Sequence, residues 1–71
     1  MDYTEKLKKL REESGLSRRQ MSELLGISRT FYWQLENKKR RISYRTAFEI
    51  AHIFGIKPDD IFYDDFKGKL N

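Results

Sequence analysis

The sequence predicts an all-α fold, and three observations support this prediction. Serines that can accept a hydrogen bond from an early backbone N–H precede three of the apolar segments. Within the segments, apolar residues recur at the spacing of one helix face. Glycine, which readily takes the left-handed conformation that ends many helices, follows three segments. The serines are Ser17, Ser28 and Ser43, and the glycines are Gly15, Gly26 and Gly55.

The first helix is expected to begin at Asp2, which forms a capping pattern with Glu5. It runs to about Ser14 and stops at Gly15, where a left-handed residue would end it. The first predicted element therefore covers the amino-terminal segment up to this glycine.

The second helix begins at about Ser17, because Gln20 lies three residues later and completes a capping box. It ends at Gly26, and a new cap, Ser28, follows only two residues later. This connection is too short to be a loop and holds the two helices at a steep angle. Residues 17–37 therefore predict a helix-turn-helix.

The third helix has two chemically different faces. Phe31, Tyr32 and Leu35 share one face by helical spacing. The other face carries side chains that suit base edges, since arginine pairs with guanine, glutamine with adenine, and a threonine methyl or apolar ring with the thymine methyl. These residues are Arg29, Thr30, Trp33, Gln34 and Asn37.

A basic segment, residues 37–41, follows this helix directly. Residues 18–45 hold eight basic and two acidic side chains, a net charge of +6, whereas the whole chain carries +4. On charge alone, such a segment is more often a solvated turn than a binding site. Next to a helix that could enter the major groove, however, it lies where a phosphate strand would run.

Two further helices are expected to be scaffold. Ser43 can cap the fourth, which ends at Gly55. Pro58 suits the first turn of the fifth, where Asp59 and Asp60 complement the helix dipole. His52 has no second ligand nearby in the pattern and is expected to face solvent.

A chain of 71 residues predicts one domain, residues 1–66, followed by a short tail, residues 67–71. No cysteine is available for a disulfide or a cysteine-based zinc site. No apolar run or leader peptide predicts a membrane or exported protein, so we expect a cytoplasmic one. The residues expected in the core are Tyr3, Leu7, Leu10, Leu16, Met21, Leu25, Ile27, Leu35, Phe48, Ile50, Ala51, Phe54, Ile61 and Phe62.

From about Lys6 to Phe62 the chain resembles the lambda-repressor-like (Cro/C1, or XRE) helix-turn-helix proteins. No single piece is diagnostic, but the order and spacing of the pieces are specific. They are Leu7-Lys-Lys-Leu-Arg11, Ser14-Gly-Leu-Ser17, Leu25-Gly-Ile-Ser-Arg29, Leu35-Glu-Asn37 with the basic stretch after it, Ala47-Phe-Glu-Ile-Ala51, Phe54-Gly-Ile56 and Asp59-Asp-Ile-Phe62.

The resemblance implies a compact five-helix DNA-binding domain with its recognition helix at residues 28–37. It implies base-facing roles for Arg29, Thr30, Trp33 and Gln34. The residues expected to contact DNA phosphates are Arg18, Arg19, Ser28, Asn37, Lys38, Lys39, Arg40, Arg41 and Tyr44. Arg11 and Glu36 match a pair that ties the first helix to the third in relatives; a plain surface ion pair is the alternative. Trp33 is alternatively an interface anchor or a partly buried residue.

Four positions depart from the family pattern. Lys38 replaces a common glycine; a left-handed conformation there would cost about 1 kcal/mol, so a different loop geometry is expected. Tyr32 replaces a smaller aliphatic residue and is expected to push the helix outward or turn its hydroxyl to the surface. Arg18 replaces a glutamine and is expected to brace the third helix less. Ile42 stands where relatives often carry proline.

The expected function is that of a sequence-specific DNA-binding regulator, a repressor acting as a homodimer on a palindromic operator. The dimer contact is expected at Phe62, Tyr63, Phe66 and Leu70; the alternative is a terminus packed on its own domain. No catalytic set, phosphate-binding glycine loop or metal-ligand spacing is present, so neither an enzyme nor a cofactor is expected.

Two other functions remain open. One is an antitoxin that represses its own operon and binds a toxin. The other is a protein-interaction module that no longer binds DNA, which the aromatic trio Phe31, Tyr32 and Trp33 favours.

Overall fold

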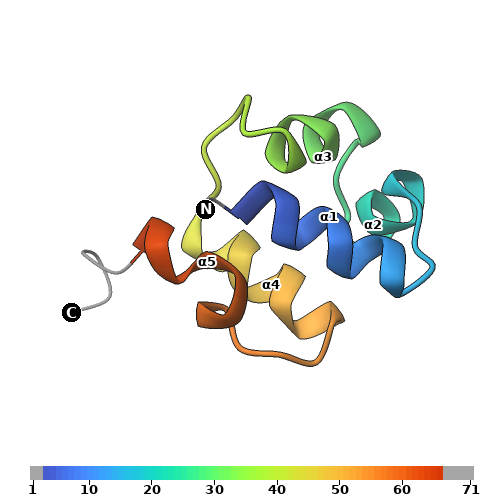
Figure 1. The fold of residues 1–71 in the computed structure, drawn as a ribbon. Helices are drawn as coiled ribbons and strands as arrows, with labels where there is room; N and C mark the ends of the chain where they lie inside the picture. The colour runs from blue at the N-terminus through green and yellow to red at the C-terminus, as the bar shows by residue number, and fades with distance from the viewer. Residues whose placement is uncertain (1–2, 67–71) are drawn as a thin grey trace.

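A computed structural model of the chain describes residues 3–66, with side chains through Tyr63. The helices are α1 (Tyr3–Glu13), α2 (Arg18–Leu25), α3 (Arg29–Glu36), α4 (Tyr44–Ile53) and α5 (Asp59–Phe66) (Figure 1). No strand occurs within residues 3–66, so the predicted all-α fold is confirmed. The expected cap at Asp2 lies outside the described residues.

The helices begin where the caps were predicted. The hydroxyls of Ser17, Ser28 and Ser43 each accept a hydrogen bond from the backbone N–H three residues later. Gln20 completes the capping box by accepting from the Ser17 N–H over 2.8 Å. Pro58 directly precedes α5, and its carbonyl accepts hydrogen bonds from two amides of the first turn. Three local sequence signals therefore set the starts of α2, α3 and α4.

Four helices end at a left-handed residue, and one of these residues is not glycine. Lys38 has a φ of 57°, close to the 71°, 69° and 68° of Gly15, Gly26 and Gly55. Its N–H donates to the Leu35 carbonyl, and the Lys39 N–H donates to the Gln34 carbonyl over 2.7 Å. The expectation of a different loop geometry was wrong, because these two hydrogen bonds hold the lysine in the conformation that glycine would take.

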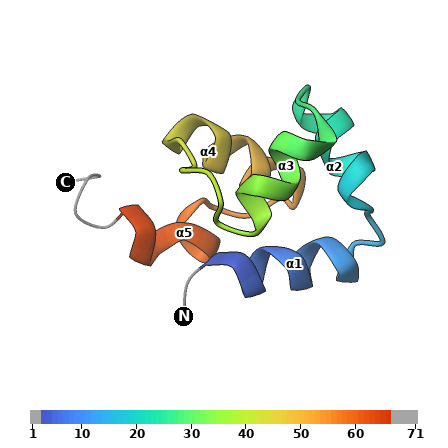
Figure 2. The same cartoon turned by 90° about the horizontal axis from the view of Figure 1, so that it is seen from above.

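The helices form a bundle in which α2 packs against α3 and α4, while α1 packs against α3 and α5. The views in Figure 1 and Figure 2 place α2 and α5 at opposite ends of the molecule. No other helix lies over α3 in Figure 2, so its outer side is left uncovered. The packing therefore supports α3 from behind and presents it to solvent.

Tyr3 joins three helices at one end of the core. Its ring lies 5.1 Å from the ring of Phe62 on α5, and its hydroxyl donates to the Leu35 carbonyl of α3 over 2.6 Å. Both aromatic side chains are fully buried. Phe62 is thus a core residue, and the expectation that it contributes to a dimer contact was wrong.

Most of the predicted core residues are buried or half-buried, and Phe48 is the exception. Its side chain is 54% exposed, because the buried stripe of α4 runs through Ala47, Ile50 and Ala51 and leaves Phe48 to one side. Ile42, which was not predicted in the core, is buried in the loop before α4.

Tyr32 corrects a further expectation. Its side chain is completely buried, so the expectation that its hydroxyl turns to the surface was wrong. The hydroxyl makes no hydrogen bond of standard geometry, although the Glu36 carboxylate lies close by on the next turn of α3. The core therefore holds both the ring and the hydroxyl of a tyrosine at a position where the family pattern has a smaller aliphatic residue.

Candidate nucleic-acid interface

The uncovered face of α3 carries the residues expected to read bases. Arg29, Thr30 and Trp33 are exposed, and Gln34 is half-buried. The indole of Trp33 is 45% exposed, so it is not a core side chain. On the opposite side of the same helix, Tyr32, Leu35 and Glu36 are buried. The helix therefore separates a supporting face from an accessible one.

A shallow hollow lies between the start of α2 and this face of α3. It is lined by Arg18, Arg19, Arg29, Thr30 and Trp33. Three arginines and a tryptophan therefore share its lining, and no acidic side chain lines the hollow. Such a surface attracts a polyanion and offers several donors to phosphate oxygens.

The loop after α3 folds back onto the helix. Its residues Lys38–Arg41 are all exposed. The guanidinium of Arg40 lies 4.7 Å from the centre of the Phe31 ring, and its Nε donates to Gln34 Oε1 over 3.1 Å. Sequence reasoning had treated Arg40 as a phosphate contact and did not predict this pair, because no helical spacing relates a loop residue to α3.

Two other residues expected at phosphates also have structural contacts. The Ser28 hydroxyl accepts from the Phe31 N–H as the cap of α3. The Asn37 side chain donates its amide to the Trp33 carbonyl over 2.9 Å at the other end. Tyr44, which is 45% exposed, is the first residue of α4 and follows the basic loop. Ser28 and Asn37 thus lie at the two ends of α3, next to its uncovered face.

Glu36 holds α1, α2 and α3 together through two arginines. Arg11 of α1 donates through Nε to Glu36 Oε2 over 2.8 Å and through Nη2 to Oε1 over 3.2 Å, a two-point pairing. Arg18 of α2 donates through Nε to Oε1 over 3.1 Å. This bond ties α2 to the last turn of α3, so Arg18 takes part in bracing α3.

In this cluster the Glu36 carboxyl and the Arg11 guanidinium are stabilised in their charged forms, and the Tyr32 hydroxyl is stabilised in its neutral form. Burial raises the pKa of the Glu36 carboxyl, but hydrogen bonding by Arg11 and the charges of Arg11 and Arg18 outweigh it, so the pKa is lowered overall. Burial works against the charge on Arg11, yet its bonds to Glu36 raise its pKa. Burial and the neighbouring carboxylate raise the pKa of Tyr32, which keeps its hydroxyl neutral.

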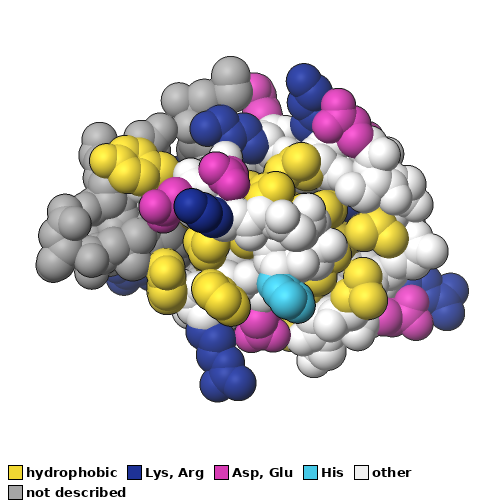
Figure 3. Space-filling view, turned by 90° about the horizontal axis from the view of Figure 1, so that it is seen from below, with side chains coloured by type: hydrophobic (Ala, Val, Ile, Leu, Met, Phe, Trp, Pro, Cys, Tyr) yellow, Lys and Arg dark blue, Asp and Glu magenta, His cyan; other side chains and the backbone are white. Residues whose placement is uncertain are grey.

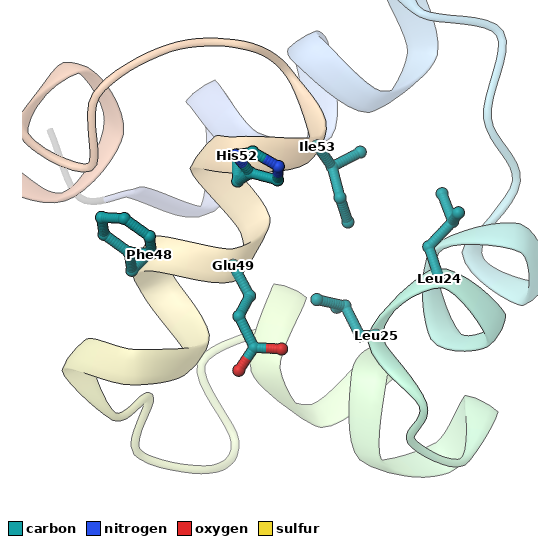
Figure 4. Close-up of a pocket in the computed structure, with 6 residues that line it drawn as sticks. All are labelled: Leu24, Leu25, Phe48, Glu49, His52 and Ile53. Carbon is teal, nitrogen blue, oxygen red and sulfur yellow. The ribbon is translucent and has the colours of Figure 1, made fainter.

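A second hollow, between α2 and α4, lies away from this interface. Figure 4 shows Leu25 and Ile53 facing each other across it, with Phe48 and His52 on α4 at its edge. The imidazole is exposed, as predicted. Figure 3, which views the molecule from below, shows hydrophobic side chains scattered over this face among polar ones.

Within residues 3–66 no group of three or more histidine, cysteine, aspartate or glutamate residues could hold a metal ion. None of the helices described is long and apolar enough to cross a membrane. The candidate functional site is the uncovered face of α3, because its exposed polar side chains lie next to the arginines of α2 and the basic loop.

Comparison with known protein families identifies the fold. A family model described as a helix-turn-helix domain matches residues 4–63, most of the chain. The chain belongs to the helix-turn-helix family. The resemblance to lambda-repressor-like proteins drawn from the sequence is thus confirmed, and α2 with α3 forms the motif after which this helix-turn-helix protein is classified.

Curated relatives agree with this assignment. The helix-turn-helix protein is 39% identical over 61 residues to an HTH-type transcriptional regulator, MJ0272, of Methanocaldococcus jannaschii, covering 84% of this chain and 92% of that one. It is 31% identical over 78 residues to the HTH-type transcriptional regulator YqaE of Bacillus subtilis, covering 97% and 67%. It is 35% identical over 63 residues to the control protein C.MunI of a Mycoplasma species, covering 87% and 85%. No solved structure matches the chain.

Proposed function

We propose that this protein is a sequence-specific DNA-binding transcriptional regulator whose α3 enters the major groove. The observation that carries the proposal is the accessible face of α3, with Arg29, Thr30 and Trp33 flanked on both sides by cations. The names of the curated relatives, two of them HTH-type transcriptional regulators, support it. A binding role suits this surface better than a catalytic one, since no nucleophile and base are paired on it.

The centre and the edges of this surface suit different roles in DNA binding. The exposed side chains of α3 face the base edges, where Arg29 can donate twice to one guanine. The arginines of the α2 hollow and the basic loop lie on either side of this face, where they can contact the flanking phosphate strands and hold α3 in register. Specificity thus comes from the centre of the surface and most of the affinity from its edges.

We further propose that two copies bind a twofold-symmetric operator and repress transcription by occluding a promoter. One α3 has eight residues and reaches only a few base pairs, so a second copy on a half-site about 10–10.5 bp away would double the readout. Tyr63, 53% exposed at the end of the described side chains, remains a candidate for the contact between copies. The side chains of Phe66 and Leu70, also expected there, lie outside the described residues.

The aromatic trio that favoured a protein-interaction module is not exposed as one surface. Of the aromatic trio on α3, Tyr32 is buried and Phe31 is half-buried beneath Arg40, so only Trp33 is open to a partner. A continuous aromatic surface of the kind that anchors protein interfaces is not present on this helix. The trio therefore does not favour a protein partner over DNA, and no described contact favours a toxin partner.

Selection of bound duplexes from a random pool tests the proposal. We expect a preferred palindromic sequence for the wild type, and Arg29→Ala should bind it about 10- to 100-fold more weakly while keeping its helical circular dichroism spectrum. Lys9→Ala is the control, because Lys9 is an exposed cation on α1 that lines a hollow against α5. Equal binding of every duplex by the wild type would reject the assignment.

A further inference from the structure

One arginine of the basic loop is bound to a base-facing residue. Arg40 Nε donates to Gln34 Oε1 over 3.1 Å, while its guanidinium lies over the ring of Phe31, 4.7 Å from the ring centre. Two contacts of different kinds therefore hold this planar group against α3. The backbone adds a third tie, since the Lys39 N–H donates to the Gln34 carbonyl over 2.7 Å.

The chemistry of the pair decides which way the Gln34 amide points. A guanidinium donates hydrogen bonds and accepts none, so the side-chain oxygen of Gln34 must face Arg40. The amide nitrogen, with its two N–H donors, is then the end turned away from Arg40. Because Gln34 is half-buried, the surrounding side chains restrict its other orientations.

This orientation changes the base edge that Gln34 suits. A free glutamine pairs with adenine through both ends, its oxygen accepting from N6 and its nitrogen donating to N7. The oxygen keeps a second lone pair, but the bond from Arg40 turns that end toward the loop and the nitrogen toward the groove. Gln34 therefore presents its two N–H donors, which suit the two acceptors of guanine, O6 and N7.

We infer that Arg40 is a positioning residue that sets the base preference of Gln34, so that the pair selects guanine instead of adenine. The inference rests on the proposed function, because it concerns how α3 reads the groove. It differs from a phosphate-contact role for Arg40, which would strengthen binding to every sequence equally. It also revises the adenine pairing that glutamine alone would predict.

The first test compares duplexes selected by the wild type, Arg40→Lys and Arg41→Lys. Gln34→Ala identifies the relevant base pair as the one whose preference disappears. At that position we expect the wild type to prefer guanine over adenine about tenfold. Arg40→Lys keeps the charge but loses the planar fork and its stacking, so the preference should move to adenine. Arg41→Lys, at an exposed loop position, should leave guanine preferred.

A second variant tests the same prediction without changing any charge. Phe31→Leu removes the ring beneath the guanidinium and should also move the preference toward adenine, with circular dichroism confirming the fold. Arg40 lies outside the core, so Arg40→Lys still tests the inference if Phe31→Leu folds poorly.

Three outcomes would overturn the inference: adenine preferred by the wild type, guanine still preferred by Arg40→Lys, or no base pair that depends on Gln34. A wild type that prefers no duplex at all would instead reject the proposed function, so the two failures are distinguishable.

Discussion

Lys38 shows how one residue shapes the candidate interface. Its left-handed backbone reverses the chain after α3 and directs the basic loop back over the helix. The sequence indicated the strain correctly but not its outcome, because local preference opposed this conformation while the two backbone hydrogen bonds of the turn favoured it. A rule based on neighbouring residues alone cannot decide which of these two opposing energies is larger.

Lys38→Gly should be more stable than Lys38→Ala. Both changes remove the ammonium that lies 5.9 Å from the centre of the Tyr3 ring, so the difference between the two variants isolates the backbone. Relief of the left-handed strain, about 1–2 kcal/mol, exceeds the extra backbone entropy that glycine loses on folding, about 0.5–1 kcal/mol. We expect a difference of about 0.5–1 kcal/mol in the free energy of unfolding, measured in urea. At Lys39, which is not left-handed, the glycine variant should be no more stable than the alanine variant. Equal stability of the two Lys38 variants would contradict the strain argument.

The contacts of Arg40 and the exposure of Phe48 mark the limit of sequence reasoning at this scale. Phe48 was assigned to the core because its spacing fits an apolar face, but the width of that face depends on how closely α2 approaches α4. The bond from Arg40 to Gln34 depends on the turn at Lys38. Both facts follow from tertiary arrangement, which spacing along one helix does not contain.

At the scale of elements, sequence signals were more informative. The caps Ser17, Ser28 and Ser43 and the glycines after the helices are local chemistry, and the helix boundaries follow them. The contact between Arg11 and Glu36 was anticipated from the family, whereas the part taken by Arg18 was not. One carboxylate thereby connects three helices, including both helices of the motif.

Glu36→Gln should therefore destabilise the fold strongly. The side chain is 2% exposed, and removing its charge leaves Arg11 buried without a carboxylate, at a cost of about 3 kcal/mol. Unfolding in urea at pH 7 measures this. Glu23→Gln is the matched control, because Glu23 is 66% exposed and lies 4.0 Å from Arg19; its change should stay within about 0.5 kcal/mol.

The same variant predicts a pH dependence. Because the pKa of Glu36 is lowered in the folded state, its contribution is present above its unfolded pKa, about 4.3, and is lost as the pH falls through the lower folded value. The difference in stability between the wild type and Glu36→Gln should thus narrow below about pH 4. A constant difference from pH 7 to pH 3 would show that Glu36 does not titrate as the structure implies.

For the whole molecule, the uneven charge predicts a salt dependence. Residues 18–45 carry a net +6, and the loop and α2 arginines bring much of this charge to the border of α3. The uneven charge could be predicted from the sequence, because it depends only on the order of the residues. That the charge lies beside one uncovered helix could be seen only in the folded structure.

Neutralising Lys39 and Arg41 together should weaken binding to all duplexes and reduce the slope of log affinity against log salt by about one unit for each lost phosphate contact. Titrations from low to moderate salt, with specific and random duplexes, measure this. The control removes Lys6 and Lys9 of α1, which line a hollow against α5, and should leave the slope unchanged. A loss confined to one operator would argue against phosphate contacts.

The contacts of Tyr3 also carry a consequence for the order in which the chain folds. Its ring meets Phe62 across nearly the whole described length, so that contact can form only after a long loop has closed. The pairing of α2 with α3 needs only short-range encounters and should assemble early. We therefore expect the DNA-facing motif to organise first and the docking of α5 onto α1 to complete the native state.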